Sequence, residues 1–110
     1  MTYGRVLDAL GEPTRREIFE LLRAGPRSVG EIARHVPVSR PAVSQHLRVL
    51  KDAGLVEDQQ EGTRRVYAIR PAGLNETRAW FEDMWSQALA AFKKAAEHEG
   101  GEAPRRRRRR

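Results

Sequence analysis

Glycine and proline divide the chain into short segments as far as Gly73, and no other feature of the sequence constrains the fold as strongly. Gly11, Gly25 and Pro37 each follow a helical pattern, because glycine is favoured just beyond a helix end and proline cannot continue a helix. Between these breaks, apolar residues recur at helical spacing. The pattern therefore predicts four short helices, the last of which ends at Gly54.

Residues that favour helix starts stand just after the breaks. Pro13 suits a first helical turn, where its missing N–H costs nothing. Ser28 precedes Glu31 at the spacing of a capping box, in which each side chain satisfies the other's backbone N–H. Ser39 is expected to cap the fourth helix, with Pro41 in its first turn.

A hairpin and a long helix are expected in the second half of the chain. Residues 55–57 and 66–69 are rich in β-forming side chains and flank a polar stretch with Gly62 at its turn. The longest helical pattern runs from about residue 74 to residue 98. Helices of about 8 and about 14 residues, joined by a tight turn and followed by a hairpin, are typical of a winged helix-turn-helix. The predicted fold class is mainly α with a small β-hairpin wing.

The whole net positive charge equals that of six consecutive arginines, residues 105–110. The chain has 21 Lys+Arg and 15 Asp+Glu, a net charge of +6, so without the six arginines 15 basic residues face 15 acidic ones. Residues 25–56 carry a net charge of +3 and residues 71–104 carry −3. Because the composition from Gly100 onward cannot bury apolar area, we expect one folded domain over residues 1–98 and a disordered basic tail over residues 99–110.

Composition and length exclude several classes of protein and of site. The absence of cysteine excludes disulfides, thiolate metal sites and cysteine nucleophiles. No apolar run approaches the ~18 residues of a membrane span, and the N-terminus is too short and too charged for a secretory signal. His35, His46 and His98 lie on separate helices without a recognisable triad or phosphate loop. We expect a cytoplasmic protein that is not an enzyme and holds no cofactor.

The helix that follows Ser39 has one apolar and one polar face, which suits insertion into the major groove of DNA. Val43, Leu47 and Leu50 form the inward stripe. The residues of this segment expected to contact DNA are Ser39, Arg40, Pro41, Ala42, Ser44, Gln45, His46 and Arg48. Ser44 and Gln45 are expected at base edges, since glutamine can form two hydrogen bonds to adenine, and Ala42 allows close approach. The capping serine, the two arginines and the histidine are assigned mainly to phosphates or groove edges.

Some of these assignments have a competing structural interpretation. Ser39 is in the first place a helix cap, His46 is as readily a packed histidine, and Arg48 can be a solvated helix residue. At the hairpin tip, Thr63, Arg64 and Arg65 are expected to contact phosphates or the minor groove. The alternative there is a solvated turn whose positive charges are cancelled by neighbouring acidic residues. Tyr67 and Ile69 are expected to point inward.

The last predicted helix carries a heavy aromatic load for a small domain. Trp80 and Met84, like Phe81 and Trp85, are four residues apart and cover a broad apolar face. Part of this face is expected to form a two-fold dimer interface with the first helix. The residues assigned to the interface are Val6, Leu7, Leu10, Trp80, Phe81, Met84, Trp85, Leu89 and Phe92. The alternative is that all of them belong to the core of a single chain.

Three stretches of the chain resemble the ArsR-type bacterial transcription regulators. Residues 10–18 (LGEPTRREI) resemble the opening motif of that family. Residues 39–56 (SRPAVSQHLRVLKDAGLV) resemble its recognition helix, and residues 61–74 (EGTRRVYAIRPAGL) resemble its wing. The motifs stand in the order and spacing of the family, and the resemblance covers roughly residues 1–95. It implies a dimeric DNA-binding repressor, and many members of the family release DNA when a metal binds.

The chain departs from the metal-sensing members of that family. Their cysteine pair would fall within residues 29–34, where this chain has none. A second family site uses Asp/His pairs on the last helix, where this chain has one histidine, His98, among acidic residues at positions 82, 83, 97 and 99. The resemblance is therefore to a cysteine-free, autorepressor-like branch, and no metal is expected.

Together these features predict a sequence-specific dimeric repressor that binds a palindromic bacterial operator, its own promoter included, and so associates with the nucleoid. They do not indicate an effector. The alternative is a sequence-independent architectural protein driven by the arginine tail, although the tail can also be an idle end or an appended purification sequence.

Overall fold

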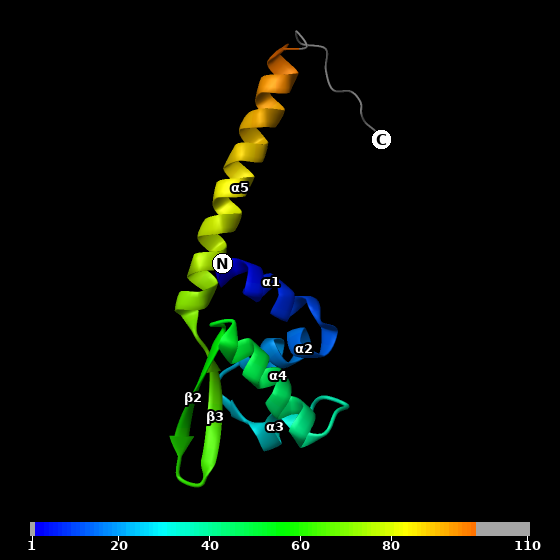
Figure 1. Cartoon of the computed structure of the whole chain (residues 1–110), viewed down its shortest axis with the longest axis vertical. Helices are drawn as coiled ribbons and strands as arrows, with labels where there is room; N and C mark the ends of the chain where they lie inside the picture. The colour runs from blue at the N-terminus through cyan, green and yellow to red at the C-terminus, as the bar shows by residue number, and fades with distance from the viewer. Residues whose placement is uncertain (1, 99–110) are drawn as a thin grey trace. The chain divides into compact units, whose positions relative to one another are not determined.

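A computed structural model describes residues 2–98 of the chain. In chain order the elements are α1 (Thr2–Gly11), α2 (Pro13–Leu22), β1 (Arg27–Ser28), α3 (Val29–Ala33), α4 (Arg40–Asp52), β2 (Val56–Glu61), β3 (Arg64–Ile69) and α5 (Pro71–His98) (Figure 1). The chain divides into two compact units at Thr77, so that the first turns of α5 belong to the first unit and the remainder forms the second. The mainly helical winged helix-turn-helix expected from the sequence is confirmed.

Local side-chain caps define where the helices begin. The Ser28 hydroxyl accepts the Glu31 N–H at 3.2 Å and the Glu31 carboxylate accepts the Ser28 N–H at 2.8 Å, which confirms the predicted capping box. The Ser39 hydroxyl accepts the N–H of Ala42 at 3.3 Å at the start of α4, as expected. At α2 the cap is Glu12, which the sequence analysis did not single out and which accepts the Arg15 N–H at 2.7 Å.

The sheet differs from the predicted hairpin in two ways. Its order is β1-β3-β2, and β1 adds a third strand by pairing Arg27 with Tyr67 and Ser28 with Val66. The wing strands are also longer than expected, because antiparallel pairing continues through polar residues as far as Glu61 opposite Arg64. Backbone hydrogen bonding sustains a hairpin arm whose side chains face water, so side-chain type alone underestimates its length.

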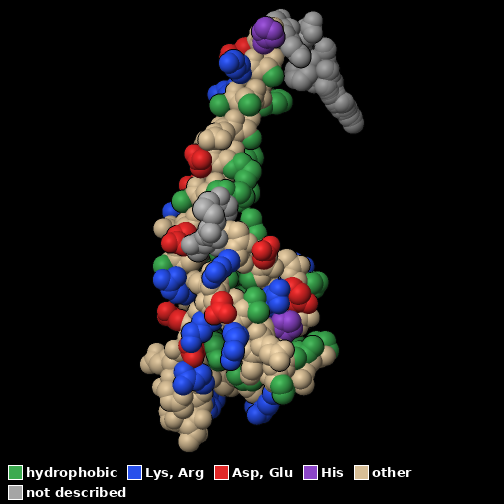
Figure 2. All heavy atoms as spheres, viewed as in Figure 1, with side chains coloured by type: hydrophobic (Ala, Val, Ile, Leu, Met, Phe, Trp, Pro, Cys, Tyr) green, Lys and Arg blue, Asp and Glu red, His purple; other side chains and the backbone are tan. Residues whose placement is uncertain are grey.

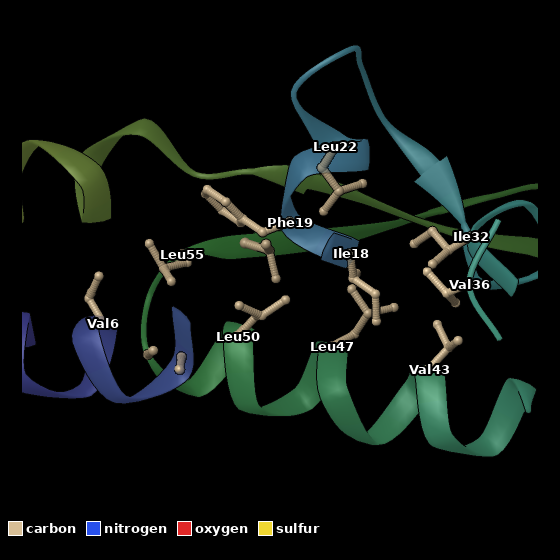
Figure 3. Packing of buried hydrophobic residues seen from close by; sticks show 13 residues of the cluster. Val6, Ile18, Phe19, Leu22, Ile32, Val36, Val43, Leu47, Leu50 and Leu55 are labelled. Carbon is tan, nitrogen blue, oxygen red and sulfur yellow. The ribbon is translucent and has the colours of Figure 1, made fainter. Parts of the chain in front are cut away.

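The core lies where α4 packs across α2 and α3 (Figure 3). Val43, Leu47 and Leu50 project in a row from α4, and all three are completely buried. Facing them are Ile18 from α2 and Ile32 from α3, also completely buried. Each such side chain contributes about 1.5–3 kcal/mol of burial free energy, which holds α4 with its opposite face outward. Tyr67 and Ile69 pack against this core from β3, as predicted.

Two of the predicted helix boundaries were wrong. Helix α3 has five residues and ends at Ala33, earlier than the expected eight or so, because the chain turns at Arg34 and His35. Helix α5 begins at Pro71 and includes Gly73, which had been interpreted as part of a break before residue 74. Gly73 is buried, and a Cβ there would collide with the carbonyl group of Gly54, whose carbon would lie 2.8 Å away.

The close approach at Gly73 leads to a stability prediction. Replacing Gly73 with alanine forces the start of α5 away from the turn at Gly54, and we expect a loss of about 1–3 kcal/mol in the free energy of unfolding. Urea denaturation measures the change. The control is Gly11→Ala, since a Cβ at that helical position meets no atom within 4 Å and should be neutral or slightly stabilising. Equal stability of the two variants would contradict the close approach.

Candidate nucleic-acid interface

Helix α4 presents a polar face to solvent opposite its buried stripe. Ser44, Gln45 and Arg48 are exposed, and none has a side-chain hydrogen bond or ion pair among the described residues. Pro41 is exposed and Ala42 is half-buried. The helix therefore leaves one amide, one hydroxyl and one guanidinium free to form hydrogen bonds with the edges and phosphates of a DNA groove.

His46 lies at the edge of this face and contacts α2. It is half-buried, and its Nδ1 lies 3.5 Å from Nη1 of Arg15. Arg15 also donates from Nε to the carbonyl of Ala9 at 2.9 Å, so one guanidinium links α1, α2 and α4. The contact with Arg15 supports the interpretation of His46 as a packed histidine. Arg15 was missed as a structural residue, although it lies in the first motif that suggested the family.

Arg34 and Arg40 line the same surface hollow as residues of the wing. The Arg40 guanidinium lies against the backbone of Gly30 in α3. A hollow next to it is lined by Ser28, Val29, Gly30, Arg34, Arg40, Thr63, Arg64 and Arg65. The structure brings together Arg40 and the predicted wing residues, and adds Arg34, which sequence reasoning did not assign to the site. Arg34 follows α3 directly. The sequence does not show that α3 packs against the wing, and for this reason it did not place Arg34 beside the wing residues.

The wing is connected to α4 by an ion-pair cluster around Asp58. The Asp58 carboxylate lies 2.8 Å from Lys51 Nζ at the end of α4 and 2.7 Å from Arg65 Nη1, and its side chain is only 9% exposed. Hydrogen bonds from Lys51 and Arg65 hold the pKa of Asp58 below its ordinary value of 3.8. Arg65 is therefore partly neutralised within the chain, as the solvated-turn alternative required, while Thr63 and Arg64 remain exposed.

Glu31 forms a second, looser link between the wing and the helix-turn-helix. Its carboxylate lies 4.0 Å from Arg64 Nη1, and the hydrogen bond from the Ser28 backbone lowers the pKa of Glu31. Positive and negative side chains are interspersed over the face shown in Figure 2. On that face there is no uniform positive coat, so any attraction for DNA there comes from particular arginines.

The residues assigned to a dimer interface have different environments. Val6 is completely buried in the core of its own chain, so its assignment to an interface was wrong. Leu10 is half-buried against the same core, whereas Leu7 is 48% exposed. The choice between core and interface for α1 depended on which face of that helix packs on α2 and α4, and apolar periodicity does not specify this.

The apolar residues of α5 are mostly uncovered. The exposed ones are Phe81, Met84, Trp85, Leu89 and Phe92, with Trp85 at 62%, and Trp80 is half-buried with its ring 6.4 Å from that of Phe81. Gly73 is the one buried residue among the described residues of α5. The alternative that these side chains form the core of a single chain is not supported, because most of them are exposed.

Neither a metal-binding cluster nor a membrane-spanning helix is found in the described part of the chain. Among residues 2–98, no group of three or more His, Asp or Glu side chains is arranged to hold a metal ion. None of the helices described is both long and apolar enough to cross a bilayer.

Comparisons with known proteins agree with this geometry. The sequence pattern described as "Bacterial regulatory protein, arsR family" matches residues 12–58. The chain is 51% identical over 96 residues to the HTH-type transcriptional regulator Rv2034 of Mycobacterium tuberculosis, covering 87% of this chain and 90% of that protein. It is 36% identical over 77 residues to the transcriptional repressor SdpR of Bacillus subtilis, covering 70% and 86%. A solved structure, an ArsR-like transcriptional regulator from Rhodococcus sp. RHA1, matches with a TM-score of 0.74 and 36% identity, covering 86% and 92%.

The Asp58 cluster leads to a pH-dependent prediction. Because the folded pKa of Asp58 is lowered, its stabilisation is present above the ordinary value of 3.8 and is lost as the pH falls through the folded pKa. Asp58→Asn should lower the free energy of unfolding by about 1 kcal/mol at neutral pH and by less at pH 3 and below. Denaturant titrations across this range provide the measurement. Glu57→Gln, at an exposed position on the same strand, is the control. If Asp58→Asn changes the free energy of unfolding no more than Glu57→Gln does, the cluster is not a stabilising link.

Proposed function

The chain belongs to the ArsR family of bacterial regulatory proteins, and on this premise we propose that it is a dimeric repressor that reads a palindromic operator with α4. It is a DNA-binding transcription regulator and not an enzyme. The observation that carries the proposal is the division of α4 into a completely buried stripe and an exposed row of Ser44, Gln45 and Arg48. A helix held in this way presents the same side chains to DNA in every encounter.

Base reading and backbone positioning are assigned to different residues. Ser44 and Gln45 contact base edges, and glutamine's two-hydrogen-bond pairing makes adenine its preferred base. Arg48 and His46 contact the groove edge, and Pro41 and Ala42 allow the first turn of α4 to approach the groove closely. The remaining contacts are to phosphates and come from Ser39, Arg40, Thr63, Arg64 and Arg65. The contact from Arg65 is the weaker one, because its guanidinium is already paired with Asp58.

A second copy of the chain covers the apolar face of α5 in this proposal. Exposed aromatic and aliphatic side chains on α5 supply an apolar surface of the kind that two-fold dimers bury. Half-buried Trp80 on α5, exposed Leu7 on α1 and half-buried Leu10 on α1 are assigned to the same interface. A two-fold dimer presents two α4 helices, and their symmetry matches the two half-sites of a palindromic operator.

The boundary of the DNA-binding domain is proposed at residue 98. The predicted disordered tail, residues 99–110, lies outside the described residues, and we assign it a sequence-independent attraction to phosphates. The architectural alternative is not favoured, because relatives of the chain are named transcriptional regulators and repressors. The proposed place of action is the nucleoid in the cytoplasm.

Selection of duplexes from a random pool tests the base-reading assignment. The wild type should enrich a palindrome, and Gln45→Ala should lose about 1–3 kcal/mol of binding free energy on that duplex while keeping its affinity for duplexes of unrelated sequence. Fluorescence anisotropy at fixed salt measures both. Gln87→Ala, on α5, is the control and should bind like the wild type. If the wild type enriches no particular sequence, the proposal is refuted.

The dimer is tested by placing a charge on the apolar face. Trp85→Glu should fold, because this side chain is 62% exposed in the single chain, but should shift the protein from dimer to monomer in analytical ultracentrifugation. DNA affinity should then fall at least about ten-fold, because one α4 reads half of the site. Gln87→Glu adds the same charge on the same helix as a control. A monomeric wild type that binds the palindrome tightly would contradict this part of the proposal.

A further inference from the structure

An arginine-lined hollow lies between the wing and the helix-turn-helix. It encloses about 330 Å³, is open to solvent, and lies entirely within the first structural unit. We call it the arginine hollow, and it is lined by Ser28, Val29, Gly30, Arg34, Arg40, Thr63, Arg64 and Arg65. Four arginines therefore contribute to its lining: Arg34 just after α3, Arg40 at the start of α4, and Arg64 and Arg65 at the start of β3.

Two of these four guanidinium groups are unpaired. Arg65 is paired with Asp58 at 2.7 Å, and Arg64 lies 4.0 Å from Glu31. Arg34 and Arg40 form no ion pair among residues 2–98. The carboxylate of Glu31 is already engaged by the backbone N–H of Ser28. Arg34 and Arg40 therefore contribute two positive charges without an ion-pair partner among residues 2–98 to the lining of the hollow.

Gly30 determines where the Arg40 guanidinium lies. A Cβ on Gly30 would stand 2.9 Å from Nη2 of Arg40, which is too close, and 3.3 Å from its Cζ, which is a tight contact. The absence of a side chain at position 30 thus lets the guanidinium of Arg40 rest on the α3 backbone at the rim of the hollow. Gly30 does not have a positive φ, so backbone conformation does not require glycine there.

We propose that the arginine hollow binds one phosphate of the DNA backbone, and that Gly30 is the positioning residue that keeps Arg40 over it. The inference rests on the proposed function, because it assigns the hollow to the same DNA that α4 reads. Guanidinium groups form paired hydrogen bonds with phosphate oxygens, and the Thr63 hydroxyl adds a donor at the wing side. One phosphate bound there links the wing and the first turn of α4 to the same strand.

Gly30→Ala separates this role from folding. The atoms that a Cβ would meet belong to the far end of a long side chain, so Arg40 can swing away, and alanine is the better residue inside a helix. The thermal midpoint of Gly30→Ala should equal or exceed that of the wild type. Its affinity for duplex DNA should fall about ten-fold, and the log–log salt dependence should become shallower by about 0.9. The preferred sequence should not change.

Arginine variants provide the second arm of the test. Arg34→Gln and Arg40→Gln should reproduce the loss of affinity and the shallower salt dependence, with no change in sequence preference. Arg23→Gln is the matched control, since Arg23 is exposed at the end of α2 and pairs with Glu20. Measurements on a duplex of arbitrary sequence keep the test valid even if the wild type selects no palindrome. The proposed function and this inference can then fail separately.

A backbone scan identifies the ligand. A single neutral methylphosphonate should weaken binding by the wild type at each contacted phosphate, whereas Gly30→Ala should be insensitive at one of these positions, that of the phosphate in the hollow. The proposal is overturned if Gly30→Ala binds DNA with the affinity and salt dependence of the wild type. It is also overturned if millimolar inorganic phosphate stabilises the wild type but not Gly30→Ala while both bind DNA equally, because the hollow would then be a site for free phosphate.

Discussion

The burial of the inward stripe of α4 is the interaction on which the rest of the molecule depends. Val43, Leu47 and Leu50 are completely buried against Ile18 and Ile32, so the rotation of α4 about its own axis is settled by the core. A helix can turn its polar side chains toward DNA reproducibly only if its other face cannot shift. The same packing that stabilises the fold thus selects the side chains that are available for reading bases.

Close backbone approaches and one ion-pair cluster position the parts around α4. Gly73 brings the start of α5 against the turn at Gly54, and Gly30 gives the Arg40 guanidinium a place on α3. Asp58 connects Lys51, near the end of α4, with Arg65 on the wing. Each of these contacts joins two different elements or an element and a turn. The placement of the wing and of the start of α5 around α4 therefore depends in part on Asp58 and Gly73, neither of which is assigned a contact with DNA.

Arginines in the folded part have two different electrostatic roles. Those at the outer part of the wing are offset by carboxylates of the same chain, whereas Arg34 and Arg40 have no such partner among residues 2–98. A body with almost no net charge can still attract a phosphate at one point where unpaired guanidinium groups converge. The apolar face of α5 is also exposed, and in the proposed dimer a second copy of the chain covers its aromatic side chains.

The sequence alone was sufficient to identify the order of the helices, the capping box at Ser28 and Glu31, and the inward stripe of α4, because these depend on spacing within one segment. The tertiary structure decided whatever depended on two segments meeting. It placed Val6 in the core and not in an interface, added β1 to the sheet, and brought Arg34 into the same hollow as the wing. The physical reason is that periodicity specifies which residues share a face of an element, whereas only packing specifies what that face meets.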